Sequence, residues 1–81
     1  MKISVAFYSY FRDLTGCSNL SLDLPEGAEI SKLVAELQGR FPKLKVMEKS
    51  TLIAVGLEYQ TGNYVLREGD EVSLFPPVQG G

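Results

Sequence analysis

The 81-residue sequence has no histidine, no tryptophan and one cysteine, and these shortages exclude several kinds of chemistry. Without histidine, it lacks the side chain most often used as a general base near neutral pH. Cys17 has no cysteine or histidine partner, which excludes an intrachain disulfide, a Cys–His metal site and a Cys–His nucleophile. We therefore expect Cys17 to be a small half-buried hydrophobic residue rather than a reactive thiol. We expect no bound metal or cofactor, and no catalysis by this domain alone.

Long apolar runs and excess positive charge are also missing. No stretch approaches the roughly 18 apolar residues of a membrane span, and the N-terminal residues do not resemble a signal peptide. The formal net charge is −2, whereas nucleic-acid binding needs a basic patch. A single cysteine fits a reducing compartment. The sequence thus predicts a cytoplasmic protein that binds neither membranes nor nucleic acids.

Alternating apolar residues predict most of the β-strands. Strands are expected at residues 3–11, 18–24 and 71–75, with a turn at 12–16 between the first two. A short apolar run at 51–55 predicts a strand buried on both faces, and 64–66 a further short strand. In the last strand, Val72 and Leu74 are expected to face the core, so Phe75 faces outward.

One amphipathic helix is expected between these strands. Its apolar residues recur at i, i+3, i+4 and i+7, at Ile30, Leu33, Val34 and Leu37. Gly39 and Pro42 are expected to end it, and residues 43–50 favour a short helical turn. Residues 56–62 predict a turn-rich connection. A mixed or antiparallel sheet packed on one main helix is an α+β arrangement, and this order of elements outlines a β-grasp fold.

The chain divides into a domain at residues 1–75 and a C-terminal tail at 76–81. Pro76 and Pro77 have no backbone N–H and hold the tail extended. Gly80 and Gly81 leave its end without side chains, and six residues reach at most ~20 Å. A Gly-Gly end can also be a frayed terminus, but the stiff proline base favours a functional tail that is mobile when free.

The carboxylate of Gly81 is the one group that no side chain duplicates. Adenylation by ATP would turn it into an activated acyl group that a sulfur or nitrogen nucleophile attacks. A partner enzyme would need a surface to hold, and strand parity places Tyr8, Tyr10 and Phe75 on the open face of the sheet. Tyr59 and Arg12 are candidates to join them. Alternatively, these aromatic side chains only cover the edge of the core.

Three stretches of this sequence resemble the small subunit of molybdopterin synthase. The ending at residues 69–81 is similar to that family's Gly-Asp-Glu-Val strand followed by Phe-Pro-Pro-Val-x-Gly-Gly. Residues 11–16 and 24–28 also look like the family, so the resemblance spans essentially the whole chain. One departure is Gly56, where the family usually has asparagine. A turn glycine adopts the left-handed geometry that asparagine tolerates, so we expect the fold to be kept.

The resemblance implies a ubiquitin-like sulfur carrier. Gly81 would be adenylated by a ubiquitin-activating-like adenylyltransferase that uses ATP, and a sulfur donor system would convert it to a thiocarboxylate. The tail would then enter the large catalytic subunit and supply sulfur to cyclic pyranopterin monophosphate, forming the molybdopterin dithiolene. The partner-binding residues of the tail would be Pro76, Pro77, Val78, Gln79 and Gly80. Phe75 would be the hydrophobic anchor at its base.

The family assembly is a heterotetramer, with two small subunits at the ends of a large-subunit dimer. The resemblance also explains why catalytic side chains are missing, because the large subunit of this sulfurtransferase would supply them. Two alternatives stay open. The protein could carry sulfur for another pathway, such as thiamine thiazole synthesis or tRNA thiolation. It could instead be a ubiquitin-like interaction or conjugation domain.

Overall fold

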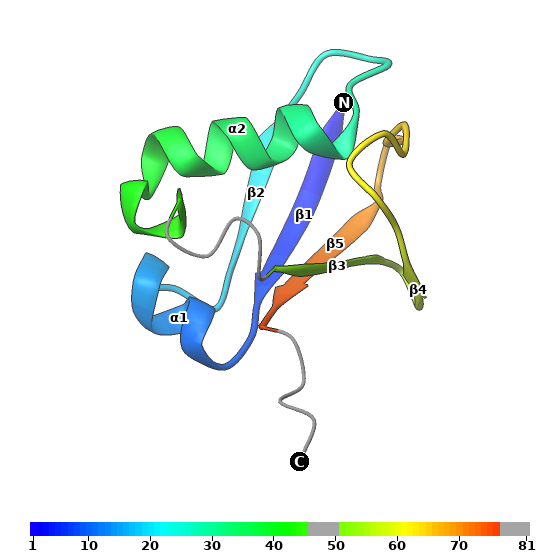
Figure 1. Cartoon of the computed structure of the whole chain (residues 1–81). Coiled ribbons are helices and arrows are strands. Elements are labelled where there is room, and N and C mark those ends of the chain that lie inside the picture. The colour runs from blue at the N-terminus through cyan, green and yellow to red at the C-terminus, as the bar shows by residue number, and fades with distance from the viewer. Residues whose placement is uncertain (46–50, 77–81) are drawn as a thin grey trace.

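A mixed β-sheet with one long helix across a single face forms the protein (Figure 1). The computed structural model describes residues 1–45 and 51–76. Within them the sheet has five strands in the order β2-β1-β5-β3-β4. The strands are β1 (Lys2–Phe7), β2 (Asn19–Asp23), β3 (Leu52–Val55), β4 (Glu58–Tyr59) and β5 (Glu71–Phe75). The central strands β1 and β5 run parallel and the other neighbours run antiparallel, which confirms the α+β, β-grasp architecture.

The core lies between helix α2 (Ile30–Arg40) and the covered face of the sheet. Ile3, Val5 and Phe7 project from β1 and are at most 1% exposed, as their alternation predicts. They meet the apolar face of α2, of which Ile30, Leu33 and Leu37 are buried while Val34 is only half-buried. Val72 and Leu74 of β5 complete this layer, so the predicted parity of the last strand is confirmed.

The segment after β1 differs from the sequence-based prediction. We expected a strand up to residue 11 and then a turn, but β1 ends at Phe7 and helix α1 spans Tyr10–Thr15. The direction changes at Ser9, whose φ of 55° is rare for a residue with a side chain. The N–H of Phe11 donates to the carbonyl of Tyr8 at 3.1 Å. This turn buries Phe11 in the core, and Gly16 ends α1 in the left-handed conformation.

Helix α2 also ends differently from the prediction. It runs through Gly39 to Arg40, and the N–H of Phe41 still donates to the carbonyl of Leu37 at 2.7 Å. Pro42 then begins a 3₁₀ turn over residues 42–45 that buries Leu44. The short helical turn expected at 43–50 is therefore present over 43–45, and its remainder lies outside the described residues.

Three smaller predictions around β3 need correction. The strand expected to be buried on both faces is fully buried only at Ala54, which lies beside Ser73 on the uncovered face, whereas Ile53 and Val55 face the core and are half-buried. The connection at 56–62 contains the two-residue strand β4. The strand expected at 64–66 is reduced to a single bridge between Val65 and Glu29. Gly56 has a φ of 61°, as expected for a turn position that asparagine or glycine can occupy.

Candidate functional site

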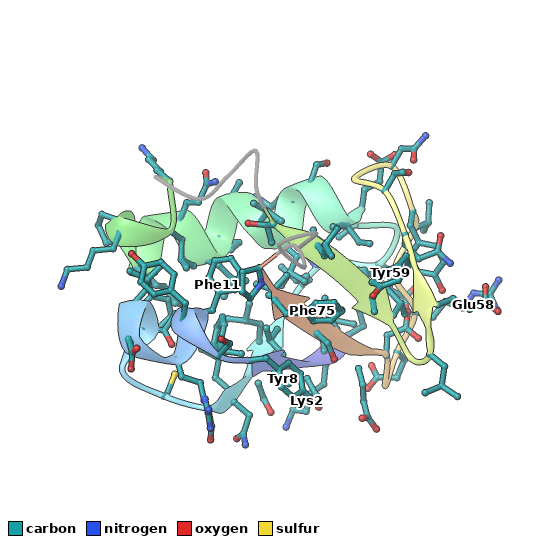
Figure 2. All side chains as sticks on the ribbon, turned by 60° about the horizontal axis from the view of Figure 1, so that its bottom comes forward. Lys2, Tyr8, Phe11, Glu58, Tyr59 and Phe75 are labelled. Carbon is teal, nitrogen blue, oxygen red and sulfur yellow. The ribbon has the colours of Figure 1, made fainter. Side chains whose placement is uncertain are left out.

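Three aromatic side chains meet on the uncovered face of the sheet (Figure 2). The ring of Phe75 lies 6.0 Å from that of Tyr8 and 5.7 Å from that of Tyr59, measured between centroids, and both pairs meet edge to face. We call these three residues the aromatic cluster. Tyr8 is 51% exposed and Tyr59 is 67% exposed, so the cluster presents apolar surface to a partner.

Strand pairing brings these distant residues together. Phe7 of β1 pairs with Leu74 of β5, which places the next residues, Tyr8 and Phe75, side by side. The N–H of Tyr8 donates to the carbonyl of Leu74 at 3.1 Å and extends this pairing by one step. Tyr59 comes from the other side of β5, because β3 pairs with both β5 and β4.

Small side chains form the floor beside the aromatic cluster. Ser73 pairs with Ala6 on one neighbouring strand and with Ala54 on the other, so one row across the sheet carries little side-chain bulk. The result is a groove with aromatic walls, which we call the aromatic groove. It is lined by Tyr8, Ala54, Gly56, Leu57, Tyr59, Ser73 and Phe75. Its shape and apolar walls fit a protruding apolar side chain of a partner protein.

The tail begins directly at this groove. Phe75 is the last residue of β5 and Pro76 follows it, half-buried. The other predicted tail residues lie outside the described residues: Pro77, Val78, Gln79, Gly80 and Gly81. A protein that took up the tail would therefore approach the molecule over the aromatic cluster.

The predicted surface residues do not all gather at this place. Tyr8, Tyr59 and Phe75 come together. Tyr10 and Arg12 instead lie exposed on α1 and are not among the residues that line the aromatic groove, so the prediction that Tyr10 shares the open face of the sheet is wrong. Sequence reasoning missed Ala54, Ser73 and Leu57. The parity of β5 gave a signal for Ser73, which lies two residues before Phe75 on the same face. The positions of Ala54 and Leu57 depend on strand pairing that no local pattern specifies.

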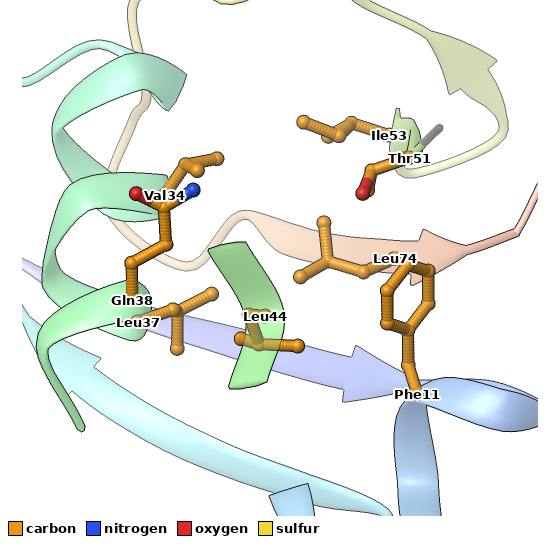
Figure 3. Close-up of a pocket in the computed structure, with 8 residues that line it drawn as sticks. All are labelled: Phe11, Val34, Leu37, Gln38, Leu44, Thr51, Ile53 and Leu74. Carbon is orange, nitrogen blue, oxygen red and sulfur yellow. The ribbon is translucent and has the colours of Figure 1, made fainter. Parts of the chain in front are cut away.

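A second cavity lies between α2 and the sheet and is part of the core (Figure 3). Its volume is about 70 Å³, and it is lined by Phe11, Val34, Leu37, Gln38, Leu44, Thr51, Ile53 and Leu74. Ligand pockets usually measure some 300–1,000 Å³. We therefore regard this cavity as a packing gap and not as a cofactor site.

The described residues supply little for chemistry of their own. Residues 1–45 and 51–76 hold no group of three or more carboxylate and cysteine side chains placed to share a metal ion. Cys17 is half-buried, as predicted, with its sulfur 3.7 Å from the hydroxyl oxygen of Thr15. Across the same residues, no helix has the length and apolar character needed to cross a membrane. The exposed aromatic side chains of the aromatic groove are suited to protein docking.

Among the described residues, a five-stranded mixed sheet with one long helix across a single face places the protein in the ubiquitin-like β-grasp class. Comparison with known proteins agrees. A structure from Pyrococcus furiosus, provisionally described as molybdopterin converting factor, subunit 1, superposes with a TM-score of 0.89. It is 32% identical in sequence, with 96% of this chain and 99% of that one covered.

Sequence comparison then specifies the family. The ThiS family model matches residues 5–81, and the chain belongs to the ThiS family. The molybdopterin synthase sulfur carrier subunit of Arabidopsis thaliana is 32% identical over 81 residues, which cover 100% of this chain and 84% of that protein. A complex of subunits 1 and 2 of the molybdopterin-converting factor from Helicobacter pylori contains a chain that is 28% identical, with a TM-score of 0.74 and both chains covered completely. The protein is thus a ubiquitin-like sulfur carrier.

Proposed function

We propose that this protein is the sulfur carrier subunit of a molybdopterin synthase and that the carboxylate of Gly81 carries the sulfur. The observation that carries the proposal is the family match, which extends through residue 81 and so includes the Gly-Gly sequence. The relatives named as carrier subunits of this synthase support the choice of pathway. The acceptor is then cyclic pyranopterin monophosphate, which gains the two dithiolene sulfurs of molybdopterin.

The chemistry proceeds in three steps. A carboxylate oxygen of Gly81 attacks the α-phosphorus of ATP and displaces pyrophosphate, which gives an acyl adenylate. Hydrosulfide delivered by the donor system attacks the acyl carbon, displaces AMP and loses its proton, which leaves a thiocarboxylate. The thiocarboxylate sulfur forms a C–S bond to the pterin precursor by displacing an oxygen substituent from the carbon that it attacks. Water then hydrolyses the resulting thioester, which returns the carboxylate and leaves the sulfur on the pterin, so two carriers in turn supply the two dithiolene sulfurs. ATP is consumed by the activating enzyme, and the carrier holds no cofactor of its own.

The tail suits this role for steric reasons. Glycine has no Cβ, so an active site can close around Gly80 and Gly81. Pro76 and Pro77 have no backbone N–H to donate to a strand ladder, so the sequence does not favour an extension of β5 beyond Phe75. The end of the chain is then free to enter first the activating enzyme and later the large subunit.

The aromatic cluster gives both enzymes a surface to hold. Aromatic side chains contribute strongly to binding where a partner buries them. The Helicobacter pylori relative is found in a complex of subunits 1 and 2 of its converting factor, which supports a large subunit as the partner here. We propose a heterotetramer of two carriers on a large-subunit dimer, acting in the cytoplasm with an adenylyltransferase as the second partner.

Intact-mass spectrometry tests the proposal directly. The purified chain is incubated with its cognate activating enzyme, ATP and the sulfur donor. Replacement of one terminal oxygen by sulfur is the expected result, and a variant lacking Gly81 should stay unchanged. The thiocarboxylated chain is then mixed with the large subunit and the pterin precursor.

The two measurements separate the alternatives. Formation of molybdopterin in the second reaction supports the pathway, whereas a thiocarboxylate that transfers no sulfur there would point to a carrier for another pathway. An unchanged mass of this chain, together with an activating enzyme whose activity has been demonstrated separately, would refute the carrier role.

A further inference from the structure

A second groove adjoins the aromatic groove at the turn between β3 and β4. It is lined by Val55, Gly56, Leu57, Tyr64, Gly69, Asp70 and Glu71, and we call it the acidic groove. Gly56 and Leu57 line both grooves. A protein seated on the aromatic cluster would therefore also lie against Leu57.

Leu57 is fully exposed, with a relative accessibility of 103%. It stands in the turn between β3 and β4, where the positive φ of Gly56 reverses the chain. A leucine here contributes nothing to the core, and a polar residue would serve the turn as well. Leu57 lines both the aromatic groove and the acidic groove.

Two carboxylates define the character of the second groove. Asp70 is held in place because one of its oxygens accepts the N–H of Arg67 at 2.9 Å. Glu71 is exposed and shares a face of β5 with Ser73 and Phe75, so its side chain lies on the same docking side as the aromatic cluster. The acidic groove therefore carries negative charge next to Leu57, which complements a positively charged side chain of a partner.

The aromatic cluster alone is small for a stable protein interface. Such interfaces bury about 800 Å² on each partner, which is several times what three partly exposed rings provide. Leu57 and the acidic groove are the continuous surface over which the contact can extend. A partner's apolar side chain would gain burial against Leu57, and a partner's cation would gain attraction next to it.

We propose that the docking face for the large subunit continues from the aromatic cluster over Leu57 into the acidic groove. The large subunit then places an apolar side chain against Leu57 and a lysine or arginine opposite Asp70 and Glu71. This inference rests on the proposed function, because it takes the large subunit as the partner.

The test measures the dissociation constant of the carrier from the large subunit encoded by the same organism. Leu57→Ala removes the fully exposed leucine. Val65→Ala is its control, because Val65 is also aliphatic and at the surface, where it is 50% exposed. Glu71→Gln removes one charge, and Glu26→Gln removes another exposed carboxylate, from the turn before α2. All four side chains lie at the surface, so melting temperatures should stay close to that of the parent chain.

We expect Leu57→Ala to weaken binding about tenfold or more, as for an anchor residue at an interface. Glu71→Gln should weaken it about three- to tenfold at low salt, and its affinity should depend less on salt than that of the parent chain. Both controls should stay within about twofold. If both test variants bind as the parent does, the extension is wrong while the proposed function stands. If the parent chain does not bind the large subunit, both are wrong.

Discussion

Filling the aromatic groove should block partner docking without removing any aromatic residue. Ser73→Phe places a ring on the floor between Ala6 and Ala54, the small neighbours of Ser73 on β1 and β3. A partner side chain that would enter the groove then loses its burial. Burying one large apolar side chain is worth about 1.5–3 kcal/mol, which corresponds to a loss of affinity of about 10- to 150-fold.

The fold should tolerate this change. Ser73 is half-buried on the face of the sheet that no described element covers, and phenylalanine is favourable in strands. We expect the free energy of unfolding to change by no more than about 1 kcal/mol. Ser21→Phe is the matched control, because Ser21 of β2 is exposed on the same face and lies beyond β1 from the groove.

The assay is calorimetric titration of each variant into the large subunit, with chemical unfolding to check stability. The reasoning predicts a large loss of affinity for Ser73→Phe and little change for Ser21→Phe. Equal affinities for Ser73→Phe and the parent chain would show that no partner side chain enters the groove. Equal losses for both variants would mean that the whole face is contacted without preference for the groove.

Two further predictions concern stability. Phe11→Ala should lower the free energy of unfolding by about 3–5 kcal/mol in denaturant titration, because this side chain of α1 is 1% exposed and packs in the core. A loss below about 1 kcal/mol would mean that burial of Phe11 does not hold α1 against the core. Gly56→Ala should cost about 1–2 kcal/mol through its φ of 61° alone, since an added Cβ meets nothing within 4 Å. Gly56→Asn should cost less than alanine, and equal losses would contradict this conformational explanation.

Periodic burial made the sheet and the long helix predictable. The parity of Ile3, Val5 and Phe7 and the i, i+3, i+4 spacing of α2 follow from one buried face for each element. Helix α1 was not predictable in this way, because Tyr8 and Tyr10 continue the alternation of β1. The chain leaves the strand because burial of Phe11 requires it, and that contact is with residues distant in sequence.

The candidate site was predictable in part for the same reason. Parity placed Tyr8 and Phe75 on one face, and the structure adds that parallel pairing of β1 with β5 sets them side by side. Tyr59 was proposed without knowledge of β4, whose two residues are too few for a recognisable pattern. Its proximity to Phe75 depends on the antiparallel turn at Gly56. Contact of these residues with a partner remains a prediction.

The central position of β5 has a consequence for how the protein is made. Without it, the β1–β2 hairpin and the β3–β4 hairpin have no shared edge, because β5 is the strand that pairs with both β1 and β3. A nascent chain that has not yet reached residue 71 can form either hairpin but not the continuous sheet. The strand that completes the domain is also the strand from which the tail leaves. The sheet can therefore be completed only shortly before the C-terminal glycine is synthesised. A prematurely terminated chain would lack both the complete sheet and the terminus that is activated.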